Sequence, residues 1–200
     1  MSKTPSNPPA AYVLRASIKE TEPPIWRELS VPADYTLGDL HGILQIAFGW
    51  ENDHMHSFTV KSVEYGMTDP GFDDMGAMEN TIDEDSVCLY DLKLRRKQQF
   101  SYLYDFGDSW EHEIAVSDII PAGDAKLDLA KPRCLGGERA GPPEDVGGVW
   151  GYERMLEISK NPGHEEYEEI HEWIGDIDPE YIDITGINAK LKRAFKSGAQ

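Results

Sequence analysis

The sequence has few cysteines, no long hydrophobic run and no internal repeat. Two cysteines in 200 residues, Cys88 and Cys134, are too few for the disulfide framework of a small secreted protein. We therefore expect reduced thiols and a cytoplasmic location. No apolar stretch reaches the length of a membrane span, and no signal-peptide pattern opens the chain. We expect no association with membranes.

Basic residues are also scarce. The chain has 19 Lys and Arg against 37 Asp and Glu, which gives a formal net charge of -18 at pH 7. Phosphate backbones are bound by clustered Lys and Arg, so nucleic acid is a disfavoured partner, and a protein or small ligand is favoured. Two local basic patches, residues 95–97 and 190–196, are typical of solvated segments.

The remaining composition is enough for one packed domain, because 40% of the residues are hydrophobic and 10% are aromatic. Residues 1–10, MSKTPSNPPA, are predicted to form a disordered tail, and residues 11–196 a single domain. Residues 69–85 carry seven acids, no basic residue and several glycine or proline breakers, which indicates a solvated loop. Their acids lack the alternate spacing of a calcium-binding loop.

The centre of the domain is the stretch FSYLYDFGDSWEHE, residues 100–113. Mostly apolar and aromatic residues occupy every second position before and after a Gly-Asp-Ser turn. They are Phe100, Tyr102, Tyr104 and Phe106 before the turn, and Trp110, His112, Ile114 and Val116 after it. This period of two is typical of half-buried strands, and the turn residues between them predict an antiparallel hairpin.

The loop of this hairpin must have either an odd or an even number of residues, because a slip of one residue sends every side chain to the other face. An odd loop, most simply residues 107–109, sets Phe106 against Trp110 and Tyr104 against His112, so that the apolar faces match. A two-residue loop would oppose aromatic residues to glutamates. We therefore predict the odd loop.

The reverse face of the predicted hairpin is acidic. It sets Asp105 opposite Glu111, and facing carboxylates repel unless solvent, a cation or an arginine lies between them. Arg139 lies in the Gly/Pro-rich loop after the hairpin. It could grip an anionic ligand, but we favour a brace that neutralises Asp105, Asp108 or Glu144.

The other patterns complete the fold prediction. Alternation predicts a first hairpin from two strands, and a Thr36–Asp39 capping box begins a helix that Gly49 ends. A further strand begins near Phe58. The last third has helical spacing in three segments, from about 152, 164 and 185 onward. The fold class is therefore α+β, with a mainly antiparallel sheet, a central hairpin, one helix after the first hairpin and a helical C-terminal third.

Four blocks of the sequence carry a family resemblance: IWRELSVPADYTLGDLHGILQIAFGW (25–50), HMHSF (54–58), YLYDFGDSWEHEI (102–114) and CLGGERAGPPEDVGGVWGYE (134–153). With them, the chain resembles the Ri-plasmid ORF-three-like family, also labelled as transposon passenger proteins of TnpR type, over about residues 10–195. The resemblance implies a mobile-element or host context and no particular activity. A serine resolvase needs a catalytic serine with supporting arginines and a basic tail, which this acidic chain lacks.

One departure from the family pattern concerns metal binding. Relatives often read RACPPEDCGG where this chain has Gly141 and Val146 in place of the two cysteines. Zinc favours clustered thiolates, and only Cys134 remains here. We therefore expect no thiolate zinc site.

Histidines offer a different metal set. His54 and His56 form an H-x-H pair whose rings share one face if the segment is extended. His112 and the carboxylates of the central hairpin could complete a nitrogen and oxygen set suited to zinc, manganese or iron. Histidines at a strand edge are more often packing or hydrogen-bonding residues, so a divalent metal is the minority interpretation.

Two functions follow from these features. The leading hypothesis is a non-catalytic accessory protein of a mobile element or its host, which binds through the acidic turn and the Gly/Pro-rich loop. Its predicted binding residues are Asp105, Asp108, Trp110, Glu111, Arg139, Glu144 and Asp145. The alternative is a metal-dependent hydrolase with ligands His54, His56 and His112 and with Asp105 or Glu113 as general base.

Overall fold

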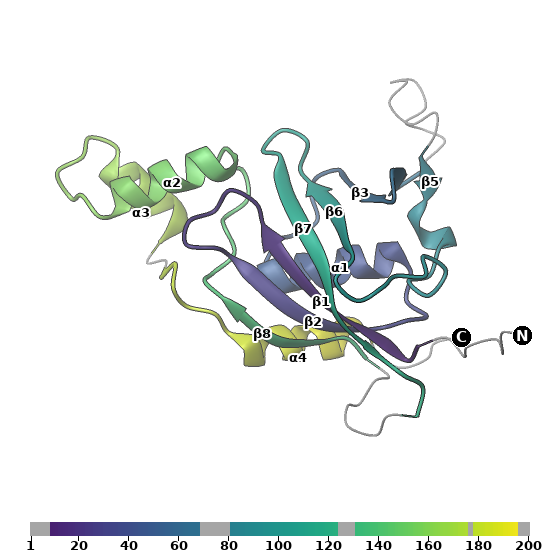
Figure 1. The fold of residues 1–200 in the computed structure, drawn as a ribbon. Coiled ribbons are helices and arrows are strands. Elements are labelled where there is room, and N and C mark those ends of the chain that lie inside the picture. The colour runs from purple at the N-terminus through teal and green to yellow at the C-terminus, as the bar shows by residue number, and fades with distance from the viewer. Residues whose placement is uncertain (1–8, 69–80, 124–130, 176–177, 196–200) are drawn as a thin grey trace, which may run out of the picture.

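A mainly antiparallel sheet of eight strands forms the centre of the protein, as predicted (Figure 1). The computed structural model describes residues 9–68, 81–123, 131–175 and 178–195. The strand order is β5-β4-β3-β6-β7-β1-β2-β8, and β4 and β5 form its parallel pair. The strands are β1 (Ala11–Ile18), β2 (Trp26–Pro32), β3 (His56–Val60), β4 (Val63–Gly66), β5 (Ile82–Asp83), β6 (Gln99–Tyr104), β7 (Trp110–Ile120) and β8 (Arg133–Glu138). Most of the predicted tail, residues 1–8, and most of the acidic loop, residues 69–80, lie outside the described residues.

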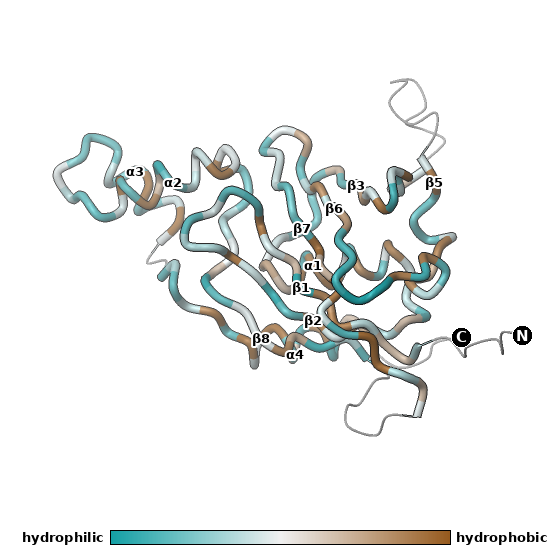
Figure 2. The backbone as a smooth tube through the Cα atoms, in the orientation of Figure 1, coloured by the Kyte–Doolittle hydropathy of each residue, from teal (hydrophilic) through white to brown (hydrophobic). Residues whose placement is uncertain are grey.

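Helices cover one face and one edge of this sheet. They are α1 (Leu37–Phe48), the short 3-10 helix η2 (Glu84–Ser86), α2 (Gly148–Ser159), α3 (Tyr167–Ile174) and α4 (Ile184–Ala194). In Figure 1, α1 lies behind the sheet, α4 runs beside β8, and α2 and α3 project from one side. Hydrophobic and hydrophilic residues are mixed along the central strands, whereas the connection between α2 and α3 is mostly hydrophilic (Figure 2). In the described ranges, no helix is long and apolar enough to cross a bilayer.

The first helix begins where the sequence predicts. The Thr36 hydroxyl accepts the backbone N–H of Asp39 at 3.0 Å, and the Asp39 carboxylate accepts the N–H of Thr36 at 2.9 Å. Gly49 ends α1 in the left-handed conformation, with φ of 88°. The capping box is confirmed, and it fixes the helix whose buried face packs against the aromatic residues of β6 and β7.

Strands β6 and β7 pair two residues away from the predicted register. Tyr104 lies opposite Trp110 and Tyr102 opposite His112, so the predicted pairs Tyr104–His112 and Phe106–Trp110 are wrong. The loop has an odd number of residues, 105–109, and Tyr104 and His112 still share the buried face. The predicted facing of Asp105 and Glu111 is also wrong, because Leu103 occupies that position.

The backbone of Asp105 accounts for the shift. Asp105 adopts a positive φ of 55°, its carboxylate accepts the N–H of Gly107 at 2.9 Å, and its carbonyl accepts the N–H of Ser109 at 2.7 Å. Because of these local hydrogen bonds, β6 ends at Tyr104. The two further strand pairs of the predicted register, at residues 105 and 106, do not form. Phe106 is consequently outside the core, with 48% of its surface exposed.

Candidate functional site

The β6–β7 turn packs directly against the start of α2. The Asp108 carboxylate accepts the N–H of Gly147 at 2.9 Å, and a Cβ atom on Gly148 would lie only 2.4 Å from the Asp108 carbonyl oxygen. Both glycines have positive φ, of 88° and 68°. Glycine at these positions therefore allows the two backbones to touch. We call the combined surface of residues 105–109 and 140–150 the turn–loop junction.

Glu144 ties the same loop to the core. The buried Tyr104 hydroxyl donates to the Glu144 carboxylate, whose other oxygen accepts the N–H of Glu51 at 3.0 Å. Burial, followed by the adjacent Glu144 carboxylate, raises the pKa of Tyr104 well above its ordinary value. Tyr104 is therefore a neutral donor. The Trp50 indole donates to the carbonyl of Pro142 at 2.9 Å, which adds a second fixed point.

One group of potential metal ligands lies at the junction. His54 Nδ1 is 3.7 Å from Asp105 Oδ2, and His54 Nε2 is 3.3 Å from Asp145 Oδ1. One ligand atom from each of the three residues lies within 4.8 Å of the others, and no other such group occurs among the described residues. Zinc ligands at roughly 2.1 Å from the ion lie about 3.4 Å apart, and one imidazole offers a single nitrogen to one ion, so both carboxylates would have to approach the same nitrogen of His54 before this set could hold a cation.

The predicted ligand set His54, His56 and His112 is not assembled. His56 stacks on His41 with ring centroids 3.4 Å apart, and its Nε2 contacts both carboxylate oxygens of Glu84 at 2.8 and 3.0 Å. His112 is fully buried and its Nδ1 donates to the Trp110 carbonyl at 2.9 Å. Each predicted ligand therefore has its own partners. The H-x-H pair separates because β3 begins only at His56, which leaves His54 in the preceding loop.

A buried polar cluster around His41 was missed by the sequence interpretation. His41 Nδ1 lies 2.8 Å from the Tyr102 hydroxyl, and its Nε2 lies 2.5 Å from Asn52 Oδ1. Burial, with a smaller contribution from the neighbouring His56, lowers the pKa of His41 to about 3. The only available signal was the place of His41 on the apolar side of α1. Its neutral ring bridges the helix and the hairpin.

Arg139 does not brace the acids of the turn, so that prediction is wrong. The buried side chain donates from Nε to Glu180 at 3.0 Å and from Nη1 to the carbonyl of Pro23 at 3.0 Å. Arg139 has a positive φ of 66° and directs its guanidinium to the segment before α4. The turn acids are instead satisfied by backbone N–H groups and by Tyr104.

Of two further predicted binding residues, one is buried and the other is exposed but ion-paired. Trp110 is fully buried and cannot contact a partner, while Glu111 pairs with Lys19 at 2.9 Å. Two aromatic residues outside the predicted binding set are exposed there: Phe106 in the turn and Trp150 near the start of α2, which is 75% exposed. The surface of the junction therefore combines exposed aromatic rings with the carboxylates Asp108, Glu144 and Asp145.

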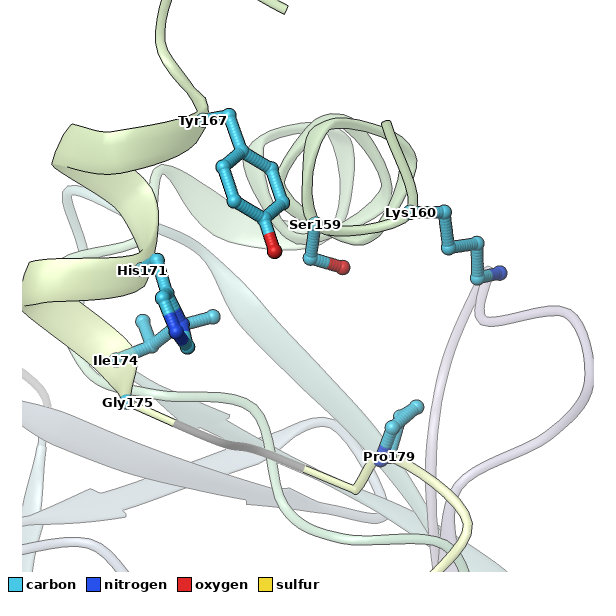
Figure 3. A pocket seen from close by; sticks show the side chains of 7 residues that line it. All are labelled: Ser159, Lys160, Tyr167, His171, Ile174, Gly175 and Pro179. Atoms are coloured by element: carbon cyan, nitrogen blue, oxygen red, sulfur yellow. The ribbon is translucent and has the colours of Figure 1, made fainter. Parts of the chain in front are cut away.

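A separate pocket of about 240 Å³ lies beneath the α2–α3 pair (Figure 3). Tyr167 and His171 of α3 face the end of α2 across it, with Pro179 on the opposite side. Its lining residues are Ser159, Lys160, Tyr167, His171, Ile174, Gly175 and Pro179. The pocket shares no residue with the junction, and none of the predicted site residues lines it.

Comparison with known proteins gives a consistent assignment. A crystal structure of a protein of unknown function, MM3350 from Methanosarcina mazei Go1, is similar with a TM-score of 0.74 and 37% identity; the match covers 88% of this chain and 96% of that one. The uncharacterized protein y4hQ of Sinorhizobium fredii is 36% identical over 166 residues, which are 82% of this chain and 81% of y4hQ. The model of the plasmid pRiA4b ORF-3-like proteins matches residues 10–186. The chain therefore belongs to the plasmid pRiA4b ORF-3-like family.

Proposed function

We propose that the protein is a non-catalytic binding module whose turn–loop junction recognises a cationic segment of a partner protein. The observation that carries this proposal is the exposure of Phe106 and Trp150 on the two segments that also carry the half-buried Asp108 and Glu144 and the exposed Asp145. Aromatic faces attract guanidinium and ammonium groups, and carboxylates pair with arginine through two parallel hydrogen bonds. Tryptophan is also enriched among the residues that dominate binding energies.

Hydrogen bonds connect the parts of the junction before any partner binds. The Asp108–Gly147 and Tyr104–Glu144 hydrogen bonds hold the turn, the loop and β6 together. A surface that is already ordered before binding avoids much of the cost of immobilising side chains and loops. This favours recognition by a preformed surface over folding on binding.

The overall charge supports the same class of partner. A net charge of -18 attracts positively charged segments and accelerates their association at low salt. The plasmid-type family supports an accessory role for a mobile element or its host. The partner would be a protein with exposed Arg or Lys residues.

The test is binding of fluorescently labelled peptides that contain arginine and aromatic residues, measured by anisotropy. Trp150→Ala should weaken binding by about tenfold or more, because truncation of a central tryptophan costs roughly 2 kcal/mol or more. Trp173→Ala is the matched control, because Trp173 is half-exposed on α3 and outside the junction. Equal affinities for the two variants would contradict the proposal, as would turnover of a small substrate without any specific partner in a pull-down.

A second candidate function is cation binding by His54, Asp105 and Asp145, favoured by the proximity of their ligand atoms. A divalent cation there would link the β6–β7 turn to the Gly/Pro-rich loop and neutralise their carboxylates. Metal analysis of the purified protein should then find one ion per chain, and Asp145→Asn should lower that content. Absence of stoichiometric metal would remove this candidate and leave the peptide-binding proposal in place.

A further inference from the structure

A cavity with a positive lining lies between the start of β8 and α4. Figure 1 shows the start of β8 at the end of the sheet away from the β6–β7 turn. The cavity has a volume of about 330 Å³, and it is lined by Lys131, Pro132, Arg133, Asn188, Ala189 and Lys192. Three of these six residues are cations and none is an acid. The chain as a whole has about two acidic residues for every basic one. At this cavity, by contrast, basic residues outnumber acidic ones.

Hydrogen bonds between Asn188 and β8 fix the cavity in place. Asn188 Oδ1 accepts the N–H of Cys134 and its Nδ2 donates to the carbonyl of Cys134, both at 2.9 Å. The amide thus pairs with the edge of β8 as a neighbouring strand would. Arg133 adjoins Cys134, and Lys192 lies one helical turn beyond Asn188 on the same face of α4. The hydrogen bonds of Asn188 therefore hold Arg133 at the start of β8 and Lys192 on α4 on either side of the cavity.

These cations have no carboxylate partner among the described residues. Elsewhere on the surface, Lys19, Arg96 and Arg154 each pair with an acid at 2.5–2.9 Å. Lys131, Arg133 and Lys192 form no ion pair in the described ranges. Like charges around one space repel, and a bound anion would turn that repulsion into attraction.

We propose that this cavity binds a phosphoryl group. The guanidinium of Arg133 offers a planar pair of N–H donors that matches two phosphate oxygens, and the two lysines supply point charges for the remaining negative charge. A space of about 330 Å³ is at the small end of ligand pockets, which suits a phosphate ester or diphosphate of modest size. This site uses none of the residues of the proposed peptide-binding surface.

The test compares two neighbouring residues of α4. Pyrophosphate is titrated calorimetrically into the wild-type protein, Lys192→Gln and Arg193→Gln. Both substitutions remove one positive charge from the same exposed helix turn, but only Lys192 lines the cavity. Lys192→Gln should weaken pyrophosphate binding by about tenfold or more, because hydrogen bonds to charged groups contribute about 1.5–3 kcal/mol. Arg193→Gln should leave the affinity within about twofold.

Further binding experiments distinguish a small phosphate compound from a nucleic-acid backbone as the ligand that carries the phosphoryl group. Arg133→Lys keeps the charge and removes the planar donor pair, so it should also weaken pyrophosphate. Binding of a single-stranded oligonucleotide with steep salt dependence, lost in Lys192→Gln, would identify a phosphodiester backbone as the source. Binding of pyrophosphate alone would identify a small phosphate compound. No binding of either probe, or equal losses in Lys192→Gln and Arg193→Gln, would overturn the proposal.

Discussion

The buried His112 should make the stability of the protein depend on pH. Burial lowers the pKa of His112 from 6.5 to about 4, although backbone carbonyls that accept from the ring oppose this shift. Because the folded-state pKa is the lower one, the unfolded chain binds more protons between pH 4 and 6.5. The contribution to the free energy of unfolding is therefore complete above pH 6.5 and is lost as the pH falls through this window.

The expected loss is a substantial fraction of the stability of a typical domain. Linkage with these two pKa values gives a loss of about 2 kcal/mol between about pH 8 and about pH 5 for His112. His41, whose pKa is lowered to about 3, contributes a loss of similar size. Together they amount to about 4 kcal/mol, against a total of roughly 5–15 kcal/mol for most domains.

Denaturant unfolding of His112→Phe at both pH values isolates the contribution of one ring. Phenylalanine keeps the contacts with Phe48 and Trp50 but does not titrate, so the variant should lose about 2 kcal/mol less than the wild type on acidification. Phe100→Leu is the control, because it alters the core of the same hairpin and should lower stability equally at both pH values. A wild-type stability that does not change with pH, or an unchanged pH dependence in His112→Phe, would refute the reasoning.

Three more substitutions and one control test the packing, and chemical denaturation measures the stability of each. Gly141→Ala would place a Cβ atom 1.8 Å from the Phe48 carbonyl oxygen and should cost about 3 kcal/mol or more, whereas Gly163→Ala meets only ordinary contacts and should stay within about 0.5 kcal/mol. Arg27→Lys should cost about 2 kcal/mol, because the buried guanidinium donates to three backbone carbonyls and an ammonium cannot reach all of them. Asn188→Ala should cost about 1–2 kcal/mol and increase self-association in light scattering, because it uncovers the edge of β8.

The core face shared by Tyr104 and His112 was predictable, but the end of the strand was not, and Phe106 lies outside the core. Alternation of aromatic residues determines which side chains are buried, and Tyr104 and His112 do share the core face. The loop length depends on Asp105, which adopts a left-handed backbone and bonds to Gly107 through its own carboxylate. Several loops of odd length satisfy the same alternation, so the sequence pattern alone could not distinguish them.

Partners that are distant in the sequence account for the errors at the candidate site. Arg139 was assigned to acids of the hairpin or its own loop, but its partner Glu180 is 41 residues away and is brought to it by the segment before α4. His56 was paired with His54 by spacing, but its ring stacks on His41 from α1. In both cases several acids or histidines were available as partners, and only the packing of elements decides among them.

Net charge sums over the whole chain and does not describe local clusters of charge. Charges in about 0.15 M salt are screened beyond roughly 8 Å, so an acidic surface elsewhere does not cancel three cations around one cavity. The turn–loop junction contains the β6–β7 turn and the cavity adjoins the start of β8, and these two segments lie at opposite ends of the sheet (Figure 1). They share no residue, and distant sites contribute additively to binding and stability. Trp150→Ala should therefore leave pyrophosphate binding unchanged, and Lys192→Gln should leave peptide binding unchanged, whereas a loss of both ligands in either variant would show that the two sites are coupled.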